Sequence, residues 1–310
     1  MTDEPALPTE SDGSAAEMRS GFATIIGAPN AGKSTLLNHL VGAKVSIVTH
    51  KVQTTRTIVR GVWTGDDVQV VFVDTPGIFR PKRRLDRAMV RSAWSGVRDA
   101  DVVIFLVDAV RGLVGEAADV LEELEKVRVP RLLALNKVDI APRERLLEIA
   151  AAANGRVRFD DTYMVSATTG SGTADLMERI AALMPPHPFY YPDDQVSDLP
   201  LRLLAAEVTR EKLYLRLHQE LPYDAHVETE AWDETKKGIR IEQTIYVARE
   251  TQRGIVLGKG GQAVKAIGSA ARRELTEMLD TPVHLFIHVK VRNWESDPER
   301  YREMGLEFPS

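Results

Sequence analysis

The sequence predicts an α/β fold, a mostly parallel, doubly wound sheet, followed by a smaller α+β domain. Between residues 21 and 185, short apolar segments alternate with amphipathic ones, which is the pattern of parallel strands and their covering helices. A proline-rich segment then interrupts this alternation, with five prolines from Met184 to Pro200. Beyond it we expect the order helix, strand, strand, helix, strand, with a short extra helix near 252–256.

The composition excludes several classes of protein. Hydrophobic residues make up 44% of the 310 residues and charged residues 27%, which suits about two globular domains. The chain has no cysteine, which excludes disulfides, cysteine nucleophiles and iron–sulfur clusters and favours a reducing cytoplasm. We expect no membrane span and no signal peptide. The net charge of −5 argues against bulk binding of nucleic acid but leaves a local basic patch open.

The individual elements follow from these patterns. In the first domain, strands are expected at 22–28, on both sides of a turn at 65–67, and at 101–109, 131–139 and 162–167. Helices are expected at 35–42, 116–127, 143–153 and 173–184, and in the second domain at 201–219 and 261–279. The remaining strands are expected at 224–234, 238–250 and 281–294. We therefore divide the chain into a disordered acidic tail (1–20), a nucleotide-binding domain (21–185), a linker (186–200), a second domain (201–295) and a C-terminal segment (296–310).

A phosphate loop lies between the first expected strand and helix. Residues 27–34, GAPNAGKS, match the pattern G-x-x-x-x-G-K-[ST]. Its glycines let backbone N–H groups turn towards phosphate oxygens. Lys33 is expected to reach the β- and γ-phosphates, and the Ser34 hydroxyl to hold Mg²⁺. The expected nucleotide contacts here are Gly27, Asn30, Ala31, Gly32, Lys33, Ser34 and Thr35.

The motif DTPG (74–77) ends another apolar strand. Asp74 is expected to hold Mg²⁺ through water. The N–H of Gly77 can sense a γ-phosphate and order the loop behind it. This motif therefore supplies the second half of the phosphate and metal site.

Two later motifs indicate which base is bound. Guanine presents an N1–H and an exocyclic amine side by side, which one carboxylate accepts, whereas adenine presents neither. Asp139 of NKVD (136–139) therefore selects guanine. Asn136 suits the N7 and O6 side and loop bracing, and the stem of Lys137 can cover the base. Because all these motifs end strands, they meet at the carboxyl edge of the sheet.

Residues 21–185 resemble the small GTPases of the translation-factor class. The resemblance gives Ser166 and Ala167 the role of the turn whose N–H meets guanine O6. It places the first switch at QTTR (53–56), where Thr55, or alternatively Thr54, holds Mg²⁺ and contacts the γ-phosphate. The metal ligands are then Ser34, Thr55 and Asp74, and the catalytic residues Lys33, Thr55, Gly77 and Asn30.

The same resemblance bears on the rate of hydrolysis. Ile78 stands where related enzymes place a glutamine that orients water, so intrinsic hydrolysis is expected to be slow. Asn30 stands inside the phosphate loop, and in GTPases with this asparagine and no glutamine the resemblance implies a stimulating K⁺ ion that neutralises transition-state charge. The alternative is that Asn30 only braces the loop.

The second domain carries a glycine-rich loop between two expected helices. Gly258, Lys259, Gly260 and Gly261 form a G-x-x-G motif in the sequence VLGKGGQAVKAIG. The motif and the element order resemble a KH domain of the bacterial type, in which this loop clamps about four single-stranded nucleotides. The expected RNA contacts are these four residues and Lys265. A second basic segment, residues 80–91, has six cations and one acid and is either a solvated helix face or a contact to RNA.

A GTPase of this class joined to a C-terminal KH domain is similar to the Era family of bacterial ribosome-assembly GTPases, over about residues 20–308. The resemblance implies binding near the 3′ end of 16S ribosomal RNA and a role in assembly of the 30S subunit. It also implies a cytoplasmic protein with partial peripheral membrane contact, and we expect a monomer. Two other functions stay open: a binding module in which nucleotide only stabilises the fold, and a signalling GTPase whose KH-like domain binds protein.

Overall fold

The computed structural model describes residues 18–51, 54–217, 224–292, 294 and 297–308. The first sheet has six strands in the order β2-β3-β1-β4-β5-β6. All neighbours are parallel except β2 and β3. The strands are β1 (Arg19–Ile26), β2 (Val59–Thr64), β3 (Val68–Asp74), β4 (Val102–Asp108), β5 (Arg131–Asn136) and β6 (Asp161–Val165). The expected mostly parallel sheet is therefore confirmed.

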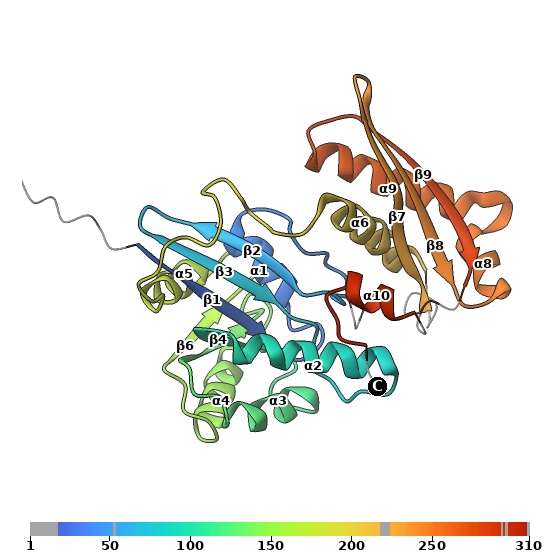
Figure 1. Cartoon of the computed structure of the whole chain (residues 1–310). Coiled ribbons are helices and arrows are strands. Elements are labelled where there is room, and N and C mark those ends of the chain that lie inside the picture. Colours follow the sequence, from blue (N-terminus) through green and yellow to red (C-terminus); the bar gives the residue numbers. More distant parts are fainter. Residues whose placement is uncertain (1–17, 52–53, 218–223, 293, 295–296, 309–310) are drawn as a thin grey trace, which may run out of the picture.

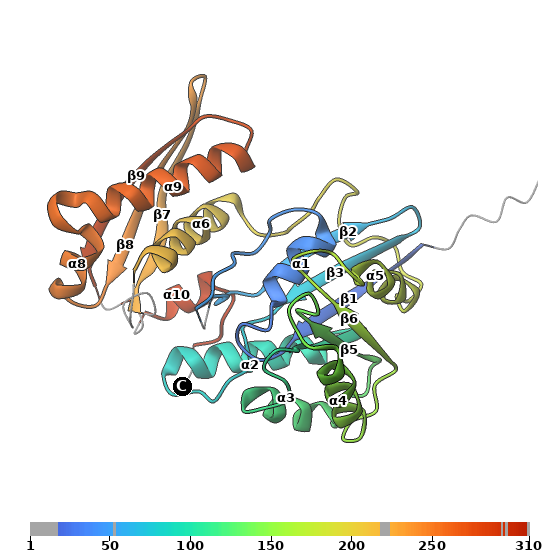
Figure 2. The ribbon, with the colours of Figure 1, turned by 180° about the vertical axis from the view of Figure 1, so that it is seen from behind.

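Helices cover both faces of this sheet, as Figures 1 and 2 show from opposite sides. In strand β4, Val102, Ile104 and Leu106 belong to one apolar core, and Val103, Phe105 and Val107 belong to the other. This double burial explains why the strands are continuously apolar rather than alternating. The first core is closed by α1 (Lys33–Val41) and α5 (Thr173–Ala182), the second by α2 (Arg84–Arg98), α3 (Glu116–Leu124) and α4 (Arg143–Asn154).

The second domain is built on a three-stranded sheet in the order β7-β8-β9. Strand β7 is antiparallel to β8, and β9 is parallel to it. Helices α6 and α9 contribute Leu213, Tyr214, Ile267 and Leu275 to the cores on the sheet. The elements are α6 (Leu201–Arg216), β7 (His226–Thr235), β8 (Gly238–Val247), α8 (Glu250–Leu257), a 3₁₀ turn (Lys259–Gly261), α9 (Gln262–Met278) and β9 (Val283–Val291). This order is the predicted one, including the short helix before the glycine loop.

The first strand begins earlier than the sequence suggested. Arg19 and Ser20, assigned above to the tail, are paired with β3, at Val68 and Gln69. The Ser20 side chain is buried, and its N–H donates to the carbonyl of Pro185 at 3.0 Å. The other residues of the expected tail, 1–17, lie outside the described part of the chain. The strand gains these two residues because β3 and the segment after α5 both offer backbone partners there.

The predicted linker lies along the first domain for much of its length (Figure 1). The side chain of Gln69 accepts hydrogen bonds from the N–H groups of Tyr190 and Tyr191, at 2.9 and 3.0 Å. Farther on, Ser197 forms a bridge with Gly61 and donates its hydroxyl to the carbonyl of Arg60 at 2.8 Å. Prolines therefore keep this segment extended, but side chains hold it against the sheet.

The C-terminal segment contains a helix that the sequence analysis did not expect, α10 (Pro298–Glu303). Asp297 caps it, because its side chain accepts a hydrogen bond from the N–H of Glu299. Tyr301 and Leu306 share an apolar cluster with Met89 of α2, and Figure 1 shows α10 between the second sheet and α2. The segment therefore joins the two domains.

Candidate functional site

The phosphate loop has the backbone that its glycines predict. Gly32 has a φ of 99°, and a Cβ there would lie 2.3 Å from Nδ2 of Asn136. The Lys33 ammonium lies inside the loop and donates to the carbonyls of Gly27 and Ala28, at 3.3 and 3.1 Å. Burial lowers the pKa of Lys33 to about 8, although Asp74 opposes the shift. The loop carbonyls thus hold the ammonium where phosphate oxygens are expected.

Three side chains that carry oxygen atoms meet beside this loop. The Ser34 hydroxyl donates to Oδ2 of Asp74 at 2.6 Å, and the Thr55 hydroxyl lies 2.8 Å from that of Ser34. Asp74 is fully buried, and within the described residues its Oδ1 has no hydrogen-bond partner. Burial raises the pKa of Asp74, and Lys33 opposes this shift. Carboxylate and hydroxyl oxygens are the donors that Mg²⁺ prefers, so these residues fit that ion.

The geometry separates the two candidate switch threonines. Thr55 lies 3.4 Å from Oδ2 of Asp74, whereas the Thr54 hydroxyl lies 2.6 Å from that of Thr49 and donates to the carbonyl of Lys51. The structure therefore brings Thr55 to the oxygen cluster and leaves Thr54 outside it. Gln53, the first residue of the expected switch motif, lies outside the described residues. The sequence analysis missed Ser46, whose hydroxyl also donates to Asp74, at 2.9 Å.

Asn136 connects the base-binding motifs to the phosphate loop. Its Nδ2 donates to the carbonyl of Ala31 at 2.8 Å, and its Oδ1 accepts from the N–H of Ala167 at 2.9 Å. Lys137 has a φ of 69° and donates to the carbonyl of Asn30 at 3.1 Å. One amide side chain therefore fixes the relative position of the three segments expected around guanine.

The ends of these segments have contrasting exposure. Asp139 is exposed at the turn after β5, while Ser166 is buried and its hydroxyl oxygen accepts from the N–H of Thr169 at 3.2 Å. Lys137 forms a 2.7 Å ion pair with Asp108, a residue that the sequence analysis did not select. The exposed carboxylate of Asp139 is accessible to a base, as guanine selection requires.

The DTPG motif touches the phosphate loop. A Cβ on Gly77 would lie 3.0 Å from Cα of Pro29, so this glycine permits the close approach. The next residue, Ile78, donates its N–H to the carbonyl of Gly27 at 3.1 Å, and its side chain is buried in the core. Asn30 has a φ of 63° and donates from Nδ2 to the carbonyl of His50 at 3.1 Å. Ile78 therefore contributes no polar side-chain group at this site.

The glycine loop of the second domain forms the tight turn expected of it. Gly258, Gly260 and Gly261 have φ values of 70°, 59° and 76°, and Lys259 is exposed. Beside the loop, α9 and β9 enclose a groove of about 290 Å³. Lys265 and Arg272 are exposed, and they line it together with Val264, Gly268, Ser269, Leu285 and Ile287. Apolar walls between cations suit unstacked bases and their phosphates; of these residues, the sequence analysis selected only Lys265 as an RNA contact.

The basic segment 80–91 is engaged within the protein. Arg80 forms an ion pair with Asp119 at 2.9 Å, and Arg83 forms one with Asp224 of the second domain at 2.7 Å. Arg84 lies over the ring of Phe308, and Arg91 lies 3.6 Å from Glu307. The segment therefore helps to hold the second domain and the C-terminal segment. Its use as an RNA contact stays a prediction.

Two buried arginines join the loop expected to be the first switch to the second domain. Arg56 is 1% exposed and donates to the carbonyl of Ala225 at 2.9 Å and to the hydroxyl of Tyr214 at 2.8 Å. From the opposite side, Arg210 is 2% exposed and donates to the carbonyl of Thr54 at 2.5 Å. We call Arg56 and Arg210 the arginine pair. The second domain thus holds the residues on both sides of Thr55.

The fold and these sites define a P-loop GTPase joined to a KH domain. Residues 22–137 match the family described as 50S ribosome-binding GTPase, and residues 220–296 match the KH domain family. The chain belongs to the Era family of GTPases. It is 63% identical to GTPase Era of Sinorhizobium medicae over 293 residues, or 94% of each chain. It is 60% identical to GTPase Era of Agrobacterium fabrum over 311 residues, which covers 100% of this chain and 98% of the relative.

Two solved structures resemble the whole molecule. One is Era in complex with MgGDPNP and nucleotides 1506–1542 of 16S ribosomal RNA, with a TM-score of 0.88 and 36% identity. The other is a variant of Era from Aquifex aeolicus bound to GDP and AlF₄⁻, with the same TM-score and identity. Each alignment covers 93% of this chain and 99% of the other. Across the residues that the structure describes, no helix combines the length and apolar character needed to cross a membrane.

Proposed function

We propose that this protein is a GTP-hydrolysing switch that binds the 3′ end of 16S ribosomal RNA through its KH domain during 30S subunit assembly. The observation that carries the proposal is the similarity, over 93% of the chain, to Era in complex with MgGDPNP and 16S RNA nucleotides. The same chain has a phosphate loop with its oxygen cluster and a basic groove beside a glycine loop. The domain limits we propose are 19–185 for the GTPase domain, 186–200 for the linker and 201–295 for the KH domain.

In the nucleotide site, each residue has a proposed task. Ser34, Thr55 and Asp74 hold Mg²⁺, which supplies charge neutralisation to the phosphates when bound. Lys33 leaves the loop carbonyls to contact the β- and γ-phosphates, and the N–H of Gly77 contacts the γ-phosphate. Asp139 pairs with guanine, while Asn136 keeps its loop against Ala31 and Ala167.

We propose that K⁺ stimulates hydrolysis at Asn30. Its Nδ2 is bonded to the carbonyl of His50, and no hydrogen bond reaches its Oδ1 from the described residues. The Oδ1 of Asn30 and the carbonyl oxygen of His50 are acceptors of the kind that suit a monovalent cation. A cation there would offset the charge that develops on the phosphates, as an arginine finger does.

The arginine pair connects the first switch to the RNA-binding domain. Movement of Thr55 towards or away from the metal site displaces Thr54 and Arg56, which are bonded to Arg210, Tyr214 and Ala225. The docked position of the KH domain therefore depends on the nucleotide, and by linkage RNA binding changes the nucleotide site.

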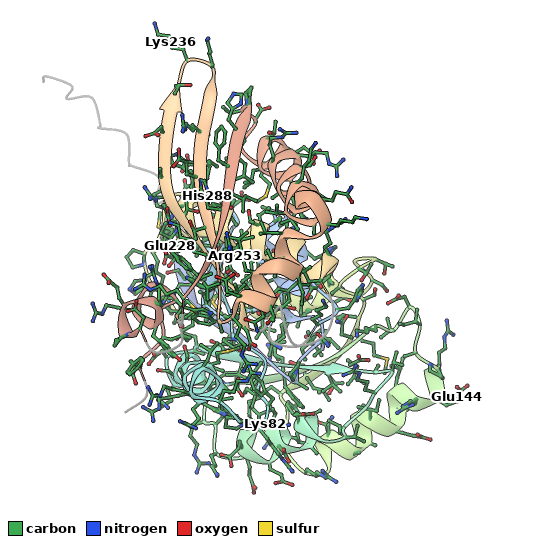
Figure 3. The ribbon with its side chains drawn as sticks, turned by 90° about the vertical axis from the view of Figure 1, so that its right-hand side faces the viewer. Lys82, Glu144, Glu228, Lys236, Arg253 and His288 are labelled. Atoms are coloured by element: carbon green, nitrogen blue, oxygen red, sulfur yellow. The ribbon has the colours of Figure 1, made fainter. Side chains whose placement is uncertain are left out.

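The test of RNA binding uses a double variant of the glycine loop. Replacing Lys259→Asp and Gly260→Asp puts two carboxylates where the phosphate backbone approaches, so binding of a labelled RNA with the 16S 3′-terminal sequence should be lost. The matched control is Lys236→Asp with Lys237→Asp, at the far tip of the second sheet (Figure 3). The control removes more positive charge, so equal losses in both variants would show that binding is nonspecific and would contradict the proposal.

The enzymatic part is tested by multiple-turnover hydrolysis of GTP. Turnover above a Lys33→Ala control identifies a switch, whereas nucleotide binding without turnover would favour a binding module. Absence of RNA protection would favour a signalling GTPase whose second domain binds protein. We further propose a cytoplasmic monomer with peripheral membrane contact. Sedimentation of the purified protein alone measures its oligomeric state, and sedimentation with vesicles measures its contact with membranes.

A further inference from the structure

A buried carboxylate of the second domain reaches the loop beside the nucleotide site. Glu211, on α6, is 3% exposed, and its Oε1 accepts a hydrogen bond from the N–H of Val48 at 2.9 Å. Within the described part of the chain, the N–H of Val48 has no other acceptor. Ile47, Val48 and Thr49 line the phosphate-loop pocket, and Figures 1 and 2 show the chain after α1 running beside α6. The second domain is therefore bonded to one wall of this pocket.

Two lysines hold Glu211 in place and keep it ionised. Lys44, in the loop after α1, donates to both carboxylate oxygens, at 3.0 and 2.8 Å, and Lys212 donates to Oε2 at 2.7 Å. Both lysines also pair with Glu274 of α9. Burial would raise the pKa of Glu211, but hydrogen bonds from Lys212, Lys44 and Val48 outweigh burial and hold the pKa below its ordinary value. Glu211 is therefore a charged acceptor with a fixed position.

The loop that Glu211 holds also carries Ser46. The Ser46 hydroxyl donates to Oδ2 of Asp74 at 2.9 Å, and the Ser46 N–H donates to Oδ1 of Asn38 on α1 at 2.9 Å. Asn38 thus holds Ser46 from the side of the GTPase domain. Two residues farther on, Glu211 holds Val48 from the side of the second domain. The position of the Ser46 hydroxyl on Asp74 therefore depends on both domains.

Ser46 matters most to Asp74 when the metal site is filled. Ser34 and Thr55 are expected to turn their hydroxyls to Mg²⁺, which leaves Ser46 as the hydroxyl that orients the Asp74 carboxylate. Removing a group that orients a metal ligand typically weakens binding of the metal about 10-fold to 100-fold. The contact between Glu211 and the loop therefore affects how tightly the site holds Mg²⁺.

We propose that Glu211 is a positioning residue through which the KH domain holds the Mg²⁺ side of the nucleotide site. It acts through Val48, which keeps Ser46 on Asp74. Undocking of the KH domain therefore weakens binding of Mg²⁺ and speeds release of the nucleotide. The inference rests on the proposed function, because it requires a Mg²⁺-dependent GTPase site.

The test measures the release of fluorescently labelled GDP from the full-length protein over a range of Mg²⁺ concentrations. Glu211→Met keeps the length of the side chain but offers Val48 no oxygen acceptor. It should raise the Mg²⁺ concentration that halves the release rate about tenfold. Glu274→Met is the matched control, because it removes the other carboxylate from the same two lysines, while no hydrogen bond joins Glu274 to Val48 among the residues described. Its Mg²⁺ dependence should stay close to that of the native protein.

A double variant tests whether the effect passes through Ser46. Ser46→Ala should shift the Mg²⁺ dependence by a similar factor. Adding Glu211→Met to Ser46→Ala should change it little further, because two substitutions that act through the same contact are not additive.

Three results would overturn the inference. These are an unchanged Mg²⁺ dependence in Glu211→Met, an equal shift in Glu274→Met, and additive shifts in the double variant. If Glu211→Met fails to fold, as its thermal melt would reveal, Glu211→Ala takes its place, because its smaller side chain admits water to the two lysines. GDP release that ignores Mg²⁺ in the native protein would contradict the proposed nucleotide site itself, whereas the three results above leave that site standing.

Discussion

Replacing Arg56→Met should release the KH domain from the GTPase domain while both domains stay folded. The guanidinium of Arg56 makes two hydrogen bonds across the interface and lies 5.8 Å and 5.4 Å from the ring centroids of Tyr214 and Trp294. Hydrogen bonds from a charged group contribute about 1.5–3 kcal/mol each, and the desolvation of the buried charge offsets part of this sum. A net loss of about 2–4 kcal/mol shifts the docking equilibrium about 30-fold to 800-fold.

The assay measures the distance between the domains. The chain has no cysteine, so spin labels can be attached at Glu144→Cys on α4 and Lys236→Cys at the tip of the second sheet without background labelling. Both residues are exposed and lie at opposite ends of the molecule (Figure 3). Pulsed electron resonance should give a narrow distance distribution for the native sequence and a broad one for Arg56→Met.

The control is Arg60→Met, a few residues along the chain. Arg60 forms a half-exposed ion pair with Asp198 at 3.0 Å, which contributes at most about 1 kcal/mol. Its distance distribution should stay narrow. An equally narrow distribution for Arg56→Met, with unchanged thermal stability, would refute the role assigned to the arginine pair.

Asp139→Asn should weaken GTP binding about 5-fold to 150-fold and improve XTP binding, because losing the hydrogen bonds between guanine and the carboxylate costs about 1–3 kcal/mol of binding free energy. Unchanged affinities for both nucleotides would show that Asp139 does not bind the base. GTP turnover should be several-fold faster in KCl than in NaCl, and Asn30→Ala should erase the difference; a rate indifferent to the cation rejects the potassium site. The pKa of His226 is lowered from 6.5 to about 3, so the unfolded state binds a proton first as the pH falls. Between pH 7.5 and 5.5, protonation of His226 in the unfolded state therefore lowers the free energy of unfolding by about 1.4 kcal/mol. In urea titrations, the free energy of unfolding of His226→Gln should fall by about that much less over this pH range. An equal fall in both proteins contradicts the lowered pKa of His226.

The sequence is enough to bring the residues expected at the nucleotide site together, because the motifs that supply them are local. Gly32, Lys33 and Ser34 are adjacent, and the strand-ending positions of Asp74 and Asn136 suffice to bring them to the same sheet edge. The choice between Thr54 and Thr55 could not be made this way. Both are threonines in one loop, and only the fold decides which hydroxyl faces Ser34.

The interface between the domains could not be predicted for a different reason. Arg56 and Tyr214 are 158 residues apart, and an arginine in a polar loop is more often solvated than buried. The hydrogen-bonded linker was missed as well, because its prolines are typical of a free spacer, whereas its contacts depend on Gln69 and Arg60 in the sheet. Tertiary partners, which no local pattern encodes, determine these features.

The held linker also limits how far the KH domain can travel. Asp198 is paired with Arg60, and α6 begins at Leu201, so only two residues, Leu199 and Pro200, are left as a tether. Fully extended, two residues span about 7 Å, and proline restricts one of them further. An undocked KH domain therefore stays at a high effective concentration next to its docking surface. Redocking is then an intramolecular event, so a small change in free energy is enough to shift the balance between the docked and undocked domain.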